Sequence, residues 1–308
     1  MLDVLTVTVP VFLLIGAGYL AVWRNLFSQG QVDGLMVFTQ RFAIPCLLFL
    51  AMARLNLAEG FELRLLVSYY SGSVICFLAG IIGTRLWLKR GAEDAVAVGF
   101  AAMFANTVLL GLPIAERAFG SESLAPNYAI IALHAGFCYA LGVTAMEIVR
   151  AGGSGFVGGM KSVGRSLATN SLMIGVALGL LVNLSGLSLP GPVIEAAQLV
   201  ASAALPAALF GLGGVLVQYK PEGDARGIFL VCAIALILHP AWTFGIGRLL
   251  GLDQGAFRAA VLTAAMAPGV NSYLFAALHG RAVRISASSV LIGTAVSILT
   301  VSGWLLIL

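Results

Sequence analysis

Two apolar stretches of this sequence each contain an asparagine, a glycine and a proline within eight residues, near the middle of the stretch. They are Asn106, Gly111 and Pro113 in the first stretch and Pro268, Gly269 and Asn271 in the second. Proline lacks a backbone N–H and clashes with the preceding turn, and glycine weakens a helix further. Each stretch is therefore predicted to be a helix that breaks near its middle, with half-helices that begin near Pro113 and after Pro268.

Paired helix breaks can bind an anion. A break leaves a half-helix whose first N–H groups have no partner and whose dipole end is positive. The amides of Asn106 and Asn271 can donate further hydrogen bonds. We therefore predict that the six residues form one site for a carboxylate, without a fixed charge. In the alternative interpretation, the breaks are simple kinks and the asparagines bond neighbouring helices.

Among the ionisable side chains within apolar stretches, His239, His134 and Arg41 are candidates for function. Ionisable groups at membrane depth are costly and indicate function. Either histidine could bind a proton during transport, because the charge of histidine changes near neutral pH. The alternative is a neutral histidine that bonds a neighbouring helix. Arg41 either faces the path of an anion or extends to the membrane interface.

The chain that must position these residues has 308 residues, of which 60% are hydrophobic and 10% charged, with a mean hydropathy of +1.02. A soluble domain has roughly 25% charged residues, so the composition argues strongly against a soluble enzyme. Ten apolar runs are near the length of about 20 residues that crosses a bilayer as a helix, and they lack the alternation of a β-barrel. We predict an all-α integral membrane protein with ten transmembrane helices. The runs cover 4–23, 31–52, 63–88, 95–119, 125–149, 166–185, 190–217, 227–250, 256–279 and 286–308.

The two halves of the chain are similar to each other. The segment Ile44–Phe49 resembles Leu205–Phe210 at an offset of 161 residues, and the same offset maps the first five runs onto the last five. We predict two repeats, 1–149 and 166–308, joined by a Gly-rich basic linker over 150–165. Because five is odd, the second repeat is inverted relative to the first. Inverted repeats are typical of secondary transporters, which bind substrate at mid-membrane.

Basic residues predict the orientation. One set of loops holds eleven basic residues and the opposite set five. The richer set is Arg24, Arg85, Lys89, Arg90, Arg150, Lys161, Arg165, Lys220, Arg226, Arg281 and Arg284. The richer side is cytoplasmic by the positive-inside rule, so both termini lie outside the inner (cell) membrane and 150–165 lies inside. The net charge of +4 therefore reflects topology and not nucleic-acid binding.

Motifs for enzymes, metals and cofactors are missing from the sequence. There is no HExxH, no GxxxxGK[ST] phosphate loop and no nucleophile–base constellation. Four isolated cysteines, Cys46, Cys76, Cys138 and Cys232, are predicted to be small buried side chains. We therefore expect no catalysis, no cofactor, no metal site and no direct use of ATP.

The two breaks, the Pro45 and Pro206 pair and the ten-run layout resemble a bacterial member of the auxin efflux carrier family. The resemblance covers the whole chain. It implies that spans 1, 2, 6 and 7 form a scaffold, often the surface of a homodimer, and that spans 3–5 and 8–10 form a mobile transport domain. It also implies that spans 4 and 9 cross at mid-membrane, with Asn106 and Asn271 at the substrate.

We therefore expect a secondary carrier of small organic anions, such as malonate, malate or auxin-like acids, that works by alternating access in the lipid bilayer. The nearest alternative is a sodium-coupled symporter of the bile-acid transporter type. An intramembrane enzyme and a channel are two further alternatives.

Overall fold

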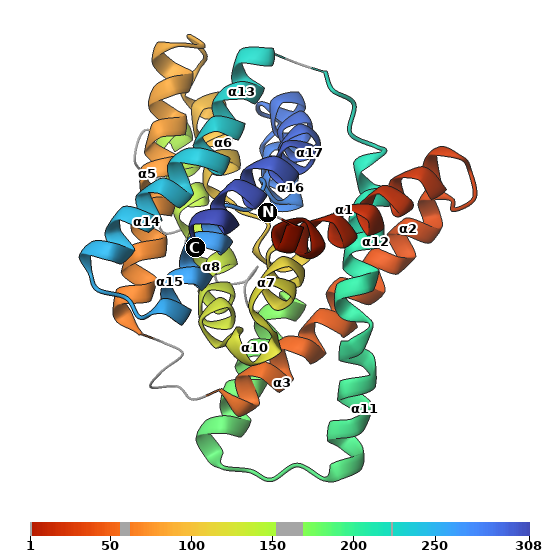
Figure 1. Ribbon diagram of the computed structural model, residues 1–308. Helices are drawn as coiled ribbons and strands as arrows, with labels where there is room; N and C mark the ends of the chain where they lie inside the picture. Colours follow the sequence, from red (N-terminus) through yellow and green to blue (C-terminus); the bar gives the residue numbers. More distant parts are fainter. Residues whose placement is uncertain (1, 56–61, 152–168, 223) are drawn as a thin grey trace.

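The computed structural model describes residues 2–55, 62–151, 169–222 and 224–308. Nearly all of the predicted 150–165 linker lies outside these residues. The described residues form helices and no strand, apart from one isolated bridge between Ala105 and Pro268 (Figure 1). The α-helices are α1 (Leu2–Trp23), α2 (Gln29–Phe38), α3 (Ile44–Arg54), α5 (Leu63–Leu86), α6 (Ala92–Met103), α7 (Leu112–Phe119), α8 (Ala125–Ala151), α10 (Ser171–Ser185), α11 (Gly191–Ser202), α12 (Ala204–Leu216), α13 (Ala225–Ala233), α14 (His239–Leu249), α15 (Gln254–Ala264), α16 (Val270–His279) and α17 (Val283–Ile307).

Seven helical segments of the described chain are long and apolar enough to cross a membrane. They are Val4–Trp23, Gln29–Arg54, Leu63–Leu86, Ala125–Arg150, Gly191–Leu216, Ala225–Leu249 and Val283–Ile307. Helix α10 is apolar but shorter. The two stretches with predicted breaks are divided into shorter helices, α6 and α7 in the first and α15 and α16 in the second. The prediction of an all-α membrane protein is therefore confirmed.

Three prolines follow a π-helical turn of five residues, two of them within long helical segments and one within the half-helix after the first break. The turns are η1 (Thr39–Ala43), η2 (Thr107–Gly111) and η4 (Ile234–Leu238), and the prolines are Pro45, Pro113 and Pro240. In each case the residue before the proline donates its N–H to the first residue of the turn. A proline lacks an N–H and its ring crowds the preceding turn. The wider π-turn accommodates the ring, so the helix continues through the proline.

Helix α10 packs closely on α3 because glycines face it. A Cβ atom on Gly175 would lie 2.6 Å from the carbonyl oxygen of Pro45, and one on Gly179 would lie 2.5 Å from that of Phe49. Small residues four apart are typical of close helix contacts in membranes. At the end of α10, the Asn183 amide donates to three backbone carbonyls at the end of α3, at 2.8–3.2 Å. These bonds tie the end of α10 to carbonyls of the last turn of α3, where a helix has fewer N–H partners than carbonyls.

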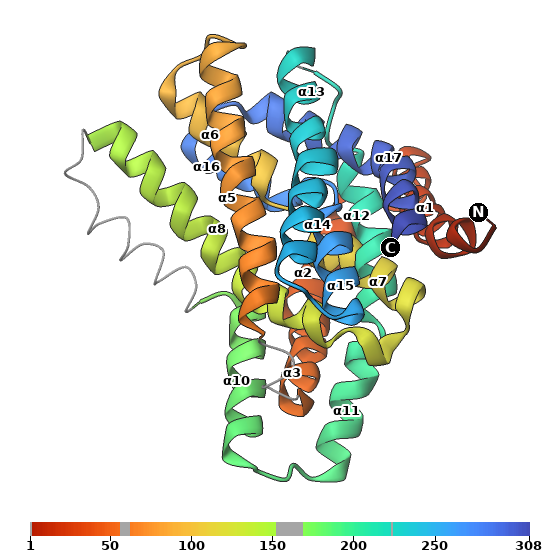
Figure 2. The ribbon, with the colours of Figure 1, turned by 60° about the vertical axis from the view of Figure 1, so that its left-hand side comes forward.

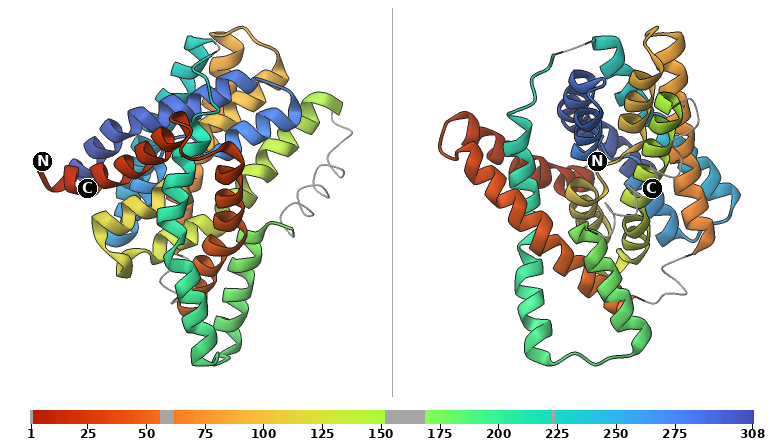
Figure 3. Two further views of the ribbon diagram at one scale, coloured as in Figure 1. Left: turned by 90° about the vertical axis from the view of Figure 1, so that its right-hand side faces the viewer. Right: turned by 180° about the vertical axis from the view of Figure 1, so that it is seen from behind.

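The helices form two groups. In the first group, α1 packs on α12, α12 on α2, and α3 on α10 and α11. In the second group, α5 packs on α6 and α14, α6 on α8, and α17 on α13 and α16. Helix α15 joins this group through α14 and α8, and α7 with η2 joins it through α15. The α10–α11 hairpin and α3 project at one end of the molecule (Figure 2). The groups meet where α1 contacts α7 and α17 and where α12 contacts η2. The beginning of α1 lies beside the end of α17 (Figure 3), and the hydroxyls of Thr8 and Ser302 are 3.3 Å apart.

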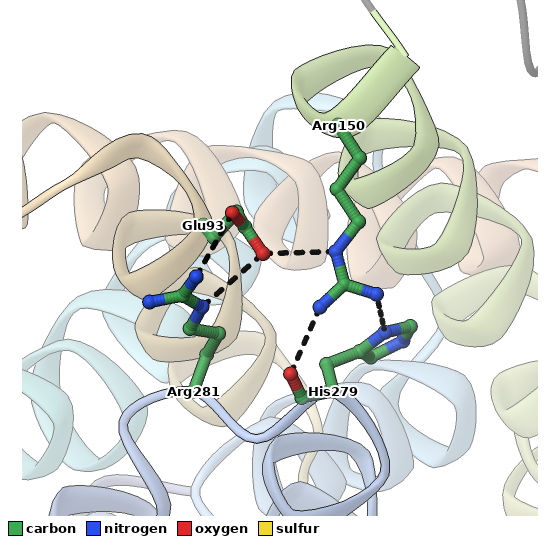
Figure 4. A network of polar contacts seen from close by, with 4 residues as sticks. All are labelled: Glu93, Arg150, His279 and Arg281. Atoms are coloured by element: carbon green, nitrogen blue, oxygen red, sulfur yellow. Dashed lines mark hydrogen bonds and ion pairs between the residues drawn. The ribbon is translucent and has the colours of Figure 1, made fainter.

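A polar network joins three helices of the second group at one end (Figure 4). The Glu93 carboxylate, in the first turn of α6, accepts from Arg150 Nε at 2.8 Å and from two Arg281 nitrogens at 3.1 and 3.2 Å. Arg150 also donates to the His279 carbonyl at 2.8 Å and to His279 Nδ1 at 3.2 Å. The bond from Arg150, with that from Arg281, lowers the pKa of Glu93. The ends of α8 and α16 are therefore fastened to the start of α6.

Candidate functional site

The two interrupted helices cross and satisfy each other's backbone. The N–H of Asn106 donates to the Ala267 carbonyl, and the N–H of Gly269 donates to the Phe104 carbonyl, both at 2.8 Å. Ala105 and Pro268 face each other between these bonds. That position of an antiparallel pair requires no N–H, which explains how a proline is accommodated there. Each break therefore supplies the hydrogen-bond partner that the other would lack.

The pairing has local two-fold character. The two residues of the bridge, Ala105 and Pro268, are 163 positions apart in the sequence (268 minus 105). This separation is close to the offset of 161 residues between the two predicted repeats. The same symmetry makes Gly269 the counterpart of Asn106, because each is the N-cap residue of the half-helix that follows. Asn271 is the second residue of α16 and is therefore not the equivalent of Asn106.

The half-helix after the first break begins earlier than the sequence suggested. We expected it near Pro113, but the helical turn begins at Thr107. The Asn106 side-chain oxygen accepts from the Leu109 N–H at 3.2 Å and starts the helix there. Pro113 is tolerated because the π-turn precedes it. The half-helix after the second break begins at Val270, directly after Pro268 and Gly269, as expected.

Beside the crossing lies a cavity of about 80 Å³. It is bounded by the first turns of both half-helices, by α8, and by η1, α3 and α10 of the first helix group. Its polar lining consists of neutral groups and one histidine; Asp, Glu, Lys and Arg are not among the described lining residues. The polar residues that line it are Gln40, Asn106, Thr107, His134 and Asn271.

The cavity lining includes a residue with a buried hydrogen-bond donor that has no partner among the described residues. Asn106 is 5% exposed, and its Nδ2 is buried with no hydrogen-bond partner among the described residues. The half-buried Asn271 also lines the cavity. The first N–H groups of α16 have no partner within the helix. Such donors are of the type that an acceptor-rich ligand such as a carboxylate requires.

His134 connects α8 to the crossing. Its Nε2 lies 3.2 Å from the Ala105 carbonyl, and because a carbonyl only accepts, this nitrogen carries a proton. Its Nδ1 lies 3.4 Å from the Tyr69 hydroxyl and is left to accept. The His134 ring also contacts the Phe104 ring edge to face, with centroids 4.7 Å apart. The crossing backbone, His134 and α5 therefore form one bonded unit.

The other predicted site residues lie outside the cavity lining. His239 is buried and its Nε2 lies 3.3 Å from Ser73 Oγ and 3.4 Å from the Tyr69 carbonyl. Arg41 is exposed on η1, next to the lining residue Gln40. Gly111 and Pro268 are part of the crossing, where Gly111 packs near Met266. Pro113 lines a larger cavity of about 530 Å³ between the two helix groups.

Two residues of this region were missed by the sequence analysis. Gly293 on α17 leaves room for Pro268, since a Cβ atom on it would lie 2.8 Å from the Pro268 Cδ. Tyr69 contacts both histidine rings, with centroid distances of 5.7 and 5.0 Å. The run of polar residues from Ser68 to Ser73 within an apolar stretch was a signal for Tyr69. No comparable signal marks Gly293 among the glycines of the chain.

The chain resembles known membrane proteins over nearly its whole length. Residues 3–154 and 156–305 match the family described as "Membrane transport protein". A Rhizobium meliloti protein named "Putative malonate transporter" is 26% identical over 99% of this chain and 96% of its own length. "Auxin efflux carrier component 8" of Arabidopsis thaliana is 21% identical over 96% of this chain and 95% of its own length. "Uncharacterized transporter YfdV" of Escherichia coli is 23% identical, with coverages of 96% and 95%.

Proposed function

The chain belongs to the membrane transport protein family that includes the auxin efflux carriers, and we propose that it is a secondary carrier of small organic anions. The observation that carries the proposal is the buried, unpartnered amide nitrogen of Asn106 beside the first turns of two half-helices. These donors would hold the carboxylate of the substrate. Gly111, Pro113, Pro268 and Gly269 would maintain the breaks that expose them.

The size of the cavity favours a short acid over an indole acid. Its volume is about 80 Å³, whereas one water molecule requires roughly 10–15 Å³. An acid of three or four carbon atoms occupies the space of a small number of waters. An auxin, with its bicyclic ring, occupies more. The relative whose name includes malonate is consistent with this class. The reported relatives give no support to the sodium-coupled bile-acid alternative.

The proposed architecture is ten crossings arranged as two inverted repeats of five. Seven long helices, the shorter α10, and the broken pairs α6–α7 and α15–α16 together make ten segments. Contacts between loops support the scheme. The beginning of α6 meets the ends of α8 and α16, and the Arg90–Asp224 ion pair adds the beginning of α13 at that end. Arg117, at the end of α7, donates to the Thr6 and Val7 carbonyls at the beginning of α1.

Alternating access would move the second helix group relative to the first. The cavity lies between the groups, with the crossing on one side and η1, α3 and α10 on the other. The first group would be the scaffold and the homodimer surface, and the second would carry the substrate across the inner membrane. The basic loops would be cytoplasmic and both termini outside.

Uptake into proteoliposomes tests the function. We expect saturable uptake of radiolabelled malonate or malate by the purified protein, with weaker uptake of indole-3-acetate. Replacement of sodium by choline should leave uptake unchanged. No carboxylate uptake above that of protein-free liposomes would overturn the proposal, and uptake that does not saturate would indicate a channel.

A matched pair of variants tests the site. Hydrogen bonds to a charged group contribute about 1.5–3 kcal/mol each, so Asn271→Ala should weaken binding roughly 10- to 150-fold. The control is Asn127→Ala, because Asn127 is buried and donates to Thr263 Oγ1 at 2.9 Å but does not line the cavity. Asn127→Ala should lower stability and leave affinity unchanged. Equal loss of affinity in both variants would contradict the assignment.

A further inference from the structure

The cavity has no permanent positive charge for an anion. Among its described lining residues, His134 is the single titratable side chain, and Lys and Arg are absent from the lining. Neutral donors can orient a carboxylate, but an ion removed from water is costly unless a counter-charge accompanies it. The chain therefore either binds its anion against this cost or obtains a positive charge at His134.

The contacts of His134 allow its Nδ1 to gain a proton. Nε2–H donates to the Ala105 carbonyl at 3.2 Å, and Nδ1 accepts from the Tyr69 hydroxyl at 3.4 Å. If Nδ1 gains a proton, the Tyr69 hydroxyl can rotate and accept from it, because a phenol oxygen both donates and accepts. Both ring nitrogens of the imidazolium would then donate to oxygen atoms.

We infer that His134 binds a proton together with the substrate anion, so that its imidazolium supplies the missing counter-charge. This inference rests on the proposed function. An unpaired imidazolium is costly in the buried, empty cavity, and the bound carboxylate removes that cost. The proton and the anion therefore favour each other's binding by the same factor. The carrier becomes a proton–anion symporter with one proton-binding group at its site.

His134 and His239 differ in their position relative to the cavity. The titratable groups around it are Tyr69 and Tyr70 from α5, Cys138 from α8 and His239 from α14. Among the described residues, no Asp, Glu, Lys or Arg side chain is in contact with this cluster. His239 is as deeply buried and also contacts Tyr69, but it does not line the cavity. It cannot offer its charge directly to the anion.

Calorimetry measures how many protons the protein takes up when it binds the acid. Wild-type protein in detergent is titrated with malonate, malate and indole-3-acetate at about pH 7, in two buffers of different ionisation enthalpy. The difference in heat gives the number of protons taken up with the acid. We expect about one proton for wild type, and an affinity that falls up to tenfold per pH unit as the pH rises. Binding without proton uptake would overturn the inference and leave the proposed function intact.

Two histidine variants locate the proton. His134→Gln keeps an N–H donor for the Ala105 carbonyl but cannot titrate, so we expect no proton uptake and an affinity independent of pH. The control, His239→Gln, should keep the proton uptake and the pH dependence of wild type. Proton uptake that persists in His134→Gln would overturn the inference.

A third variant keeps the test decisive if His134→Gln does not fold. Tyr69→Phe removes the hydroxyl that would accept from Nδ1–H, and it should shift the pH dependence of binding to lower pH. An unchanged pH profile would overturn the inference. Asn271→Ala, in contrast, should weaken binding by the same factor at every pH. If wild-type protein binds none of the three acids, the proposed function itself fails.

Discussion

Replacement of Asn106 by Ala and by Asp separates its two contributions. The side-chain oxygen caps the half-helix by accepting from the Leu109 N–H at 3.2 Å, whereas the amide nitrogen is buried without a partner beside the cavity. Ala removes both the acceptor and the donor. Asp keeps an acceptor for the cap and removes the donor, and it adds a negative charge where the substrate carboxylate would bind. Both variants should therefore bind the substrate more weakly, but only the Ala variant should be less stable than wild type.

The magnitudes follow from the two roles. Loss of an N-cap costs about 0.5–2 kcal/mol, so Asn106→Ala should lower the free energy of unfolding by that amount. Loss of a hydrogen bond to a carboxylate costs about 1.5–3 kcal/mol, or roughly a 10- to 150-fold loss of affinity. Asn106→Asp should retain the stability of wild type or exceed it, because a carboxylate is favoured at a helix N-terminus. Its affinity should fall at least as far as that of Asn106→Ala.

Two measurements on each detergent-solubilised variant are sufficient. Thermal unfolding followed by tryptophan fluorescence reports stability, and equilibrium binding of radiolabelled malonate at about pH 7.5, where a carboxyl is ordinarily ionised, reports affinity. Asn127→Ala serves as the control for loss of a buried amide away from the cavity. If Asn106→Asp binds malonate as tightly as wild type, the amide nitrogen does not contact the substrate. If Asn106→Ala is as stable as wild type, the cap is not significant.

Three further predictions concern the structure around the site. Arg150 and Arg281 lower the pKa of Glu93, so its ion pairs stabilise the fold above about pH 4.3, and this contribution is lost as the pH falls through the lowered pKa. Glu93→Gln should therefore weaken the acid dependence of thermal unfolding between about pH 5 and 3. An unchanged pH profile of unfolding would contradict this prediction. Gly293→Ala should destabilise the protein by about 1–3 kcal/mol, since its Cβ would lie 2.8 Å from Pro268, whereas Gly303→Ala on the same helix, with nothing within 4 Å, should have little effect in the same melts. A cysteine at Ser154, outside the described residues, should react with membrane-impermeant reagents only from the cytoplasm, and labelling from outside intact cells would reverse the proposed orientation.

Much of the fold follows from local properties of the sequence. Apolar runs predicted all-α membrane segments, and the proline and glycine positions predicted which two helices are interrupted. The π-turns before Pro45, Pro113 and Pro240 were not predicted. Whether a proline ends a helix or only widens a turn depends on the packing of neighbouring helices, which no local pattern contains.

The site was predicted less completely. The sequence named Asn106 and Asn271 as partners, and both line the cavity. It treated His134 and His239 as equivalent, but only His134 lines the cavity and bonds the crossing backbone. The two histidines have the same chemistry and similar apolar neighbours in sequence. Their difference arises from the positions of α8 and α14 relative to the crossing.

The sequence by itself therefore determined that this protein is a helical membrane protein with two broken helices, because helix length, hydrophobicity and proline chemistry act over a few residues. Only the tertiary structure decided how the breaks meet. The bonds from Asn106 to Ala267 and from Gly269 to Phe104 join residues more than 160 positions apart. They also decide which donors remain unpaired beside the cavity, because a buried backbone group that finds a partner across the crossing is no longer available to a ligand.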